Sequence, residues 1–470
     1  MNALPKPLFT IIFLGLALRL FLFSGILFNF GEDGLFFGDS KGFFQTAVNI
    51  KEGHGFSRDT APPYAPSAFF PPLYPLLLAG SLAVANSSIP LILLQIALSS
   101  VMPVLVWQIA RLLTDKKWVW YISAGLMAFE PLGMLWNVTL LTDTISTFFL
   151  LLSVLFFIRL LLAPLTGGAS VGRHTSRDTA ISAISLGLAS LTRPEPQYLF
   201  LLAVIALLFL ALIKKLPLRA VLLFPILFLA IFSPWLVRNV IQFGTPLAAT
   251  TGVRNIFSSL GTSVITYKTG RPYGEVQDEL QQALAQKYGL EEKEITENPA
   301  IGPILTAEGF RILRENPKET AITLVITANS FFTQDLYTTY LRQFNIIQKF
   351  AMDFSPSVVL IKEGPIELSR KIWNSIGGLF IIPIFGRLLW IVLTIFSICG
   401  AVFSVRKHGR ERVVGIVLAS LILIYAGGSL VAGFSDHGRH RYPVNPFIFI
   451  LAMYGLIRFS SILQKSMQKI

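Results

Sequence analysis

Long apolar stretches alternate with short polar segments along the whole chain. Within a stretch the apolar residues do not recur every two or 3.6 positions, as they do in the half-buried strands and helices of soluble proteins. The stretches approach the roughly 20 residues that a transmembrane helix needs, so we predict an all-α polytopic membrane protein with about ten such helices. These are predicted near Leu8–Phe28, Ile89–Leu112, Trp118–Leu135, Thr144–Leu162, Ala180–Leu191, Gln197–Ile213, Ala220–Val237, Gly378–Val405, Val413–Val431 and Pro446–Leu463.

The composition supports this interpretation. The 470 residues are 53% hydrophobic and 14% charged, whereas a soluble protein carries roughly 25% charged residues. The mean hydropathy is +0.64. The net charge of +13 does not indicate nucleic-acid binding, because the basic residues form short clusters between apolar stretches instead of one basic face. Cys399 lies inside an apolar stretch and has no second cysteine to pair with, so there is no disulfide framework.

The basic clusters predict the orientation in the membrane, because cytoplasmic loops are enriched in Lys and Arg. With the N-terminus in the cytoplasm, every predicted inner loop is basic. These loops are Arg111–Lys117, Arg173–Arg177, Lys214–Arg219, Arg406–Arg412 and the tail with Lys465 and Lys469. The first span lacks a small-residue cleavage site and is interpreted as a retained anchor. We therefore predict a multi-pass protein of the inner (plasma) membrane.

Two long segments, 29–88 and 238–370, fall on the outer side in this topology. Loops of this length usually have a function, and we expect both to cover a cavity at the outer face of a single transmembrane domain, residues 1–470. The apolar segments Pro72–Ala85 and Ala321–Phe332 are too short for spans and are expected along the interface.

Charged residues gather at the predicted outer ends of the spans. Short outer loops are normally poor in Arg, so these arginines suggest an anion such as a lipid phosphate, which suits the planar guanidinium. The alternative is that they pair with nearby carboxylates or extend to headgroups. The residues are Asp39, Asp143, Arg193, Glu195, Arg238, Asp436, His437, Arg439, His440 and Arg441.

Asp39 and Asp143 each have two possible roles. Both precede a predicted helix, where an aspartate commonly caps the first backbone N–H groups. A carboxylate at the membrane edge can also act as a general base. No Gly-rich phosphate loop, HExxH or Gly-x-Ser-x-Gly pattern occurs, which argues against nucleotide hydrolysis, a zinc protease and a serine hydrolase.

Six short motifs together resemble the GT-C superfamily of membrane glycosyltransferases, in the branch of the protein O-mannosyltransferases and lipid A aminoarabinose transferases. The similarity covers nearly the whole chain, with the motifs in the family's order. The motifs are Leu16–Leu20, Gly38-Asp39-Ser40 with Gly53–Phe56, Phe70–Pro75, Leu191–Pro194, Ser233–Asn239 with Phe243–Pro246, and Arg441–Pro443 with Pro446.

This resemblance implies a GT-C-like helical bundle and transfer of a sugar from a polyprenyl-phosphate donor to a glycan, lipid or protein acceptor, with inversion. Asp39 would be the general base. The implied phosphate-binding residues are Arg193, Arg238, Arg439, Arg441 and His440, and the implied substrate-binding residues are Asp143, Glu195, Tyr74 and Asn239. Many relatives have Asp-Glu where this chain has Asp39-Ser40, so no metal ligand is assigned, although a divalent metal fits the superfamily.

A lipid or sugar transporter is the alternative from another class. Transporters usually show internal repeats and polar groups near the middle of the membrane. Here the charged residues gather at one surface, and Arg19 is the exception among mostly apolar midspan residues. The pattern therefore favours an enzyme.

Overall fold

The computed structural model describes residues 4–166, 171–213, 215–291, 294–295, 298–347 and 356–467, and these residues contain helices and no strands beyond one isolated bridge. The predicted all-α class is confirmed. The helices of the bundle are α1 (Lys6–Phe30), α4 (Ile89–Leu113), α5 (Lys117–Phe129), α6 (Pro131–Asn137), α7 (Asp143–Thr166), α8 (Val171–Thr192), α9 (Tyr198–Leu212), α10 (Leu218–Phe243), α20 (Ile381–Val405), α21 (Arg410–Ser429) and α23 (Asn445–Met467).

Each of the ten predicted spans contains a helix, and eight helical segments of the described chain are long and apolar enough to cross a membrane. The prediction of one helix over Trp118–Leu135 was wrong. The backbone of Glu130 is extended (φ −61°, ψ 120°), so α5 ends before it and α6 begins at Pro131. Proline is favoured in a first helical turn and cannot donate an interior hydrogen bond, which explains the position of the break.

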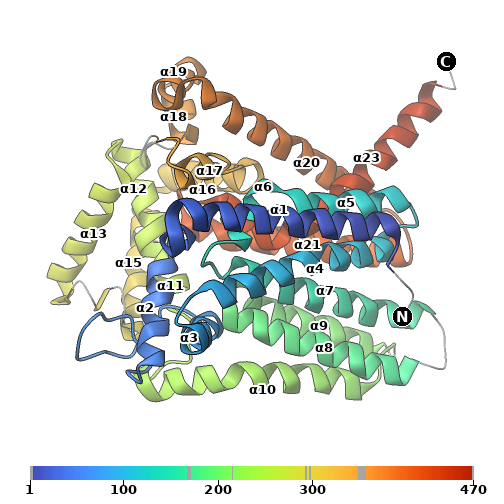
Figure 1. The fold of residues 1–470 in the computed structure, drawn as a ribbon, viewed down its shortest axis with the longest axis horizontal. Coiled ribbons are helices and arrows are strands. Elements are labelled where there is room, and N and C mark those ends of the chain that lie inside the picture. Colours follow the sequence, from blue (N-terminus) through green and yellow to red (C-terminus); the bar gives the residue numbers. More distant parts are fainter. Residues whose placement is uncertain are drawn as a thin grey trace.

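The two long segments gather toward one end of the bundle, on the left of Figure 1. The first long segment forms η1 (Gly31–Leu35), α2 (Ser40–Lys51) and α3 (Leu73–Ala85). The second forms α11 (Thr251–Asn255), η3 (Ile256–Gly261), α12 (Thr262–Thr269), α13 (Tyr273–Tyr288), α15 (Gly302–Glu315), α16 (Pro317–Thr333), α17 (Thr338–Gln343), α18 (Pro356–Lys362) and α19 (Pro365–Ile376). A short helix, α22 (His437–Arg441), precedes α23.

Apolar packing differs between these two regions. The bundle has one large apolar core, while the second outer segment has a small core of its own around Phe257, Val264 and Leu305. Close approach of α20 and α23 depends on Gly400 and Gly455, because a Cβ atom on either would overlap the backbone of the opposite helix. Small residues allow such contacts between apolar helices, as in other membrane proteins.

Contacts join four of the predicted inner loops in pairs. Arg410 pairs with Asp115, and Arg219 donates to the hydroxyl of Ser176, so contacts join neighbouring basic loops. Lys214 and Lys469 lie outside the described residues. The N-terminus is at the right of Figure 1, opposite the two long segments. The basic loops and the charged cluster described next are therefore at opposite ends of the bundle.

Candidate active site at one end of the bundle

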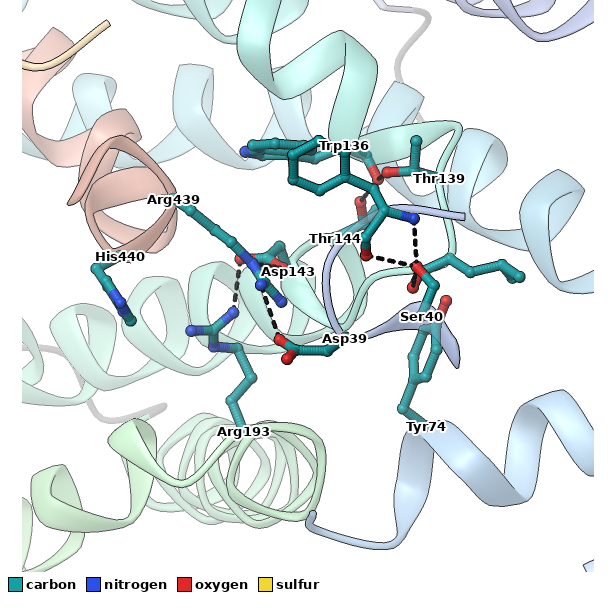
Figure 2. Close-up of polar contacts among 12 residues, drawn as sticks. Asp39, Ser40, Tyr74, Trp136, Thr139, Asp143, Thr144, Arg193, Arg439 and His440 are labelled. Carbon is teal, nitrogen blue, oxygen red and sulfur yellow. Dashed lines mark hydrogen bonds and ion pairs between the residues drawn. The ribbon is translucent and has the colours of Figure 1, made fainter. Parts of the chain in front are cut away.

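Four chain segments bring acidic and basic side chains together where α2, α7, α8 and α22 meet. Asp39 immediately precedes α2, yet its carboxylate caps no helical N–H group. Asp143 is the first residue of α7, Arg193 follows α8, and Arg439 lies in α22. Figure 2 shows the side chains of Asp39, Asp143, Arg193 and Arg439 pointing toward one another. The predicted gathering of these residues is therefore present in the fold.

Arg439 connects the two aspartates. Its Nη1 donates to Asp39 Oδ2 at 2.8 Å, and its Nε donates to Asp143 Oδ2 at 3.1 Å (Figure 2). The Asp143 side chain is fully buried, whereas that of Asp39 is 48% exposed. Asp143 is thus positioned to hold the guanidinium, and Asp39 keeps oxygen surface that a bound molecule can reach.

Arg193 completes the cluster on its other side. Its Nη1 donates to Asp143 Oδ1 at 2.6 Å, and its Nη2 and Nε donate to the two oxygens of Glu195 at 2.8 and 3.2 Å. Such charge-assisted, forked contacts are among the stronger hydrogen bonds in proteins. His440 lies beside Arg193 and Arg439 in Figure 2, and its Nε2 is 3.5 Å from the hydroxyl of Ser435.

The charge state of Asp39 follows from these neighbours. Burial disfavours the carboxylate, but the charge and hydrogen bond of Arg439, with smaller contributions from Arg193 and His440, outweigh it. The pKa of Asp39 therefore lies below its ordinary value. Asp39 is ionised near neutral pH and can accept a proton.

Arg238 and Asn239 lie apart from this cluster, near the end of α10. Arg238 Nη1 donates to the carbonyl of Ser67 and to Asn239 Oδ1, both at 2.8 Å. Its guanidinium also lies 4.8 Å from the ring centre of Trp235. Asn239 Nδ2 donates to the carbonyl of Leu247 at 2.6 Å. The pair therefore joins the first outer segment to the second.

Arg441 and Tyr74 are both fully buried. Arg441 donates to the carbonyls of Phe331 and Gln334, each at 2.7 Å, and to Asn445 Oδ1 at 3.1 Å. Its guanidinium lies 3.4 Å from the ring centre of Trp390. The Tyr74 hydroxyl donates to Gln95 Oε1 at 2.8 Å. All these contacts lie inside the protein.

The sequence patterns did not single out two further arginines, one in each of the two long segments. The guanidinium of Arg58 lies 4.0 Å from the ring centre of Phe69, and that of Arg254 lies 5.5 Å from the same ring. Both contact the stretch 67–70 that also receives the hydrogen bond from Arg238. The positive-inside tendency concerns short loops, so an arginine inside either long segment carries no such signal, and only the fold identifies these two.

Part of the chain matches a known protein family. Residues 70–237 match the family of dolichyl-phosphate-mannose-protein mannosyltransferases. The resemblance to the GT-C superfamily is confirmed. The matched region contains Tyr74, Asp143, Arg193 and Glu195, while Asp39 and Arg439 lie outside it. No curated protein sequence matches the chain.

One solved structure supports the similarity in fold. An Archaeoglobus fulgidus oligosaccharyltransferase, tethered to an acceptor peptide containing the NVT sequon, is 14% identical with a TM-score of 0.50, and the match covers 97% of this chain and 50% of that protein. The archaeal oligosaccharyltransferase AglB from the same organism, in complex with an inhibitory peptide and a dolichol-phosphate, is 12% identical with a TM-score of 0.49 and coverages of 98% and 51%. This chain thus spans about half the length of those proteins.

The acidic residues of this cluster are paired with arginines. Within the described ranges, no three His, Cys, Asp or Glu side chains converge as ligands. A guanidinium bridges Asp39 and Asp143. Ser40, which follows Asp39, is buried, with its hydroxyl 2.7 Å from the carbonyl of Phe37 and 2.8 Å from that of Leu140. The guanidinium of Arg439 therefore lies between the two aspartates and pairs with both.

Proposed function

We propose that this protein is a membrane glycosyltransferase that moves a sugar from a polyprenyl-phosphate donor to an acceptor at the outer face of the inner membrane. The main support is one ionised, half-exposed aspartate beside a buried aspartate and a shared arginine at the end of an apolar bundle. A charged base at the membrane surface and a lipid-facing bundle suit a reaction between a lipid-linked donor and a water-exposed acceptor.

Asp39 is proposed to be the general base. It would take the proton of the acceptor hydroxyl as the acceptor oxygen attacks the anomeric carbon of the sugar. The bond from that carbon to the phosphate oxygen breaks in the same displacement, so the configuration inverts and the bonding electrons leave with the lipid phosphate. A proton acceptor and cations near the leaving oxygen are both needed for this step.

The charges favour one location for the lipid phosphate. The cluster at Asp39 contains three carboxylates and two guanidiniums, so it is not a net positive site for an anion. In contrast, Arg58, Arg238 and Arg254 all contact the stretch 67–70. We propose that the donor phosphate binds at Arg58, Arg238 and Arg254 and that Arg193, Arg439 and His440 lie closer to the sugar of the donor.

Arg238→Ala is expected to weaken binding of a polyprenyl phosphate by about 1.5–3 kcal/mol, the contribution of a hydrogen bond to a charged group. Arg238→Lys should recover only part of this loss, because an ammonium cannot make the forked contact. Affinity can be measured by titrating the purified protein with a fluorescent prenyl phosphate. An unchanged affinity in Arg238→Ala, with normal thermal stability, would contradict the assignment.

The orientation can be tested separately in a Cys399→Ser background. Glu279 in α13 has a 63% exposed side chain, and Lys407 is exposed at the opposite, basic end. An impermeant maleimide applied to intact cells should label Glu279→Cys and should reach Lys407→Cys only after permeabilisation. The reverse result would place the proposed site on the cytoplasmic face.

A further inference from the structure

Asn137, the last residue of α6, lies fully buried beneath the charged cluster. Its Oδ1 accepts a hydrogen bond from Arg19 Nε at 2.8 Å. Its Nδ2 donates to Thr144 Oγ1 at 3.0 Å and to the hydroxyl oxygen of Tyr442 at 2.9 Å. Because Arg can only donate, its contact determines which side of the amide carries the oxygen. Asn137 therefore has one defined orientation.

Arg19 is itself held in place by further hydrogen bonds. It is 1% exposed in α1, and its Nη1 donates to the carbonyls of Gly15 at 2.9 Å and Ala128 at 3.0 Å. Ala128 is in the last turn of α5, where a cation is favoured by the helix dipole and by the carbonyls left free at the break. Glu130 caps the other side of the break by accepting from the N–H groups of Leu132 and Gly133.

The two donor contacts of Asn137 reach the two sides of the charged cluster. Thr144 directly follows Asp143, and Tyr442 lies three residues after Arg439. Asn137 thus ties the start of α7 to the segment carrying Arg439, below the 3.1 Å contact between Asp143 and Arg439.

The turn between α6 and α7 is held from further directions. The backbone N–H of Leu140 donates to the carbonyl of Leu35 at 2.8 Å, and the Ser40 hydroxyl contacts the Leu140 carbonyl. Gln95 Nε2 donates to the carbonyl of Thr139 at 2.8 Å. Figure 2 shows Ser40, Trp136, Thr139 and Thr144 on the side of the cluster away from His440. Because the turn is fixed in this way, the hydrogen bond from Asn137 to Tyr442 determines where the segment carrying Arg439 lies relative to the turn.

We propose that Asn137, oriented by Arg19, is a positioning residue that sets the placement of Arg439 between Asp143 and Asp39. A buried arginine at membrane depth is costly and commonly has a function. Here it fixes the amide that joins the two segments. The importance of Asn137 for sugar transfer rests on the proposed function, but its effect on the placement of Arg439 can be measured without any transfer reaction.

The probe is a thiol introduced by Asp39→Cys in the Cys399→Ser background. A nearby guanidinium stabilises a thiolate, so the pKa of this thiol should lie below the ordinary value of about 8.5. The pKa is read from the pH dependence of alkylation by iodoacetamide. Adding Arg439→Gln should return it toward about 8.5, which establishes that the probe senses Arg439.

Tyr442→Phe removes only the hydroxyl that contacts Asn137 and is nearly isosteric. We expect it to raise the pKa of the thiol, lowering the alkylation rate at neutral pH about threefold, which corresponds to roughly half a pKa unit. Asn137→Leu should have a larger effect if it folds. Tyr454→Phe is the matched control, because Tyr454 is equally buried and donates to Glu411 Oε2 at 2.7 Å, far along α23.

A merely structural role would lower thermal stability similarly in Tyr442→Phe and Tyr454→Phe and leave the pKa of the thiol equal in both. That result would overturn the proposal, and it is readable even if Asn137→Leu does not fold. A raised pKa in Tyr442→Phe alone would support it. If transfer activity were never found, the thiol measurement would still stand, so the two proposals fail separately.

Discussion

Asp39→Asn is expected to lower turnover by roughly 10²–10⁴-fold, the usual contribution of a general base. The amide keeps the size of the side chain but cannot accept the proton. Asp39 caps no helix, and Arg439 keeps its contact with the buried Asp143, so stability and binding of a polyprenyl phosphate should stay near wild type. Turnover is measured with purified protein and a lipid-linked sugar donor once an acceptor has been found by product analysis.

Asp33→Asn is a matched control, since Asp33 is exposed in the same outer segment. Full transfer by Asp39→Asn would contradict the assignment of Asp39 as the base. The pH profile gives a second readout. Asp39 must be deprotonated, and its pKa is lowered by Arg439, so wild-type activity should persist below the usual carboxylate range and fall as the pH drops through the lowered pKa. Arg439→Gln should move this acid limb to higher pH.

Arg441→Met is expected to lower the free energy of unfolding by roughly 3–5 kcal/mol, because it removes several buried charge-assisted hydrogen bonds. The carbonyls of Phe331 and Gln334, at and just after the end of α16, would lose their donors. Arg441→Lys should restore only part of the stability, since one ammonium cannot reach the positions of the planar fork. Thermal or denaturant unfolding in detergent measures the change.

Lys407→Met, at an exposed site at the basic end, serves as the control and should leave the free energy of unfolding almost unchanged. The experiment also separates two interpretations of Arg441. An Arg441→Lys protein with wild-type stability and strongly weakened binding of polyprenyl phosphate would instead support a direct contact with the donor.

Much of the bundle could be predicted from apolar patterns, because the membrane core demands long runs of apolar residues. The break between α5 and α6 was not recognised, although Glu130-Pro131 lies inside the predicted span. A proline in an apolar run can kink a helix or begin a new one. Here the proline begins a new helix. The break leaves the carbonyl of Ala128 free, and Arg19 from another helix donates a hydrogen bond to it.

For the candidate site, the sequence indicated which charged residues gather but not how they pair. Arginines at the predicted outer ends of spans are unexpected under the positive-inside tendency, and this signal led to Arg193 and Arg439. The sequence could not indicate that Arg439 bridges Asp39 and Asp143, or that Arg441 faces backbone carbonyls. Arg439 and Arg441 are two residues apart in one short helix, and only the packing around that helix decides their different partners.

The sequence by itself determined the class of protein, the approximate helices and the end of the bundle at which charge gathers. These properties depend on local composition, because the transfer of each segment into lipid is decided largely by its own residues. Tertiary structure alone decided which charges pair, which aspartate stays exposed and how Asn137 joins two distant segments. These depend on directional contacts across 50 to 400 residues of chain, which no local pattern encodes.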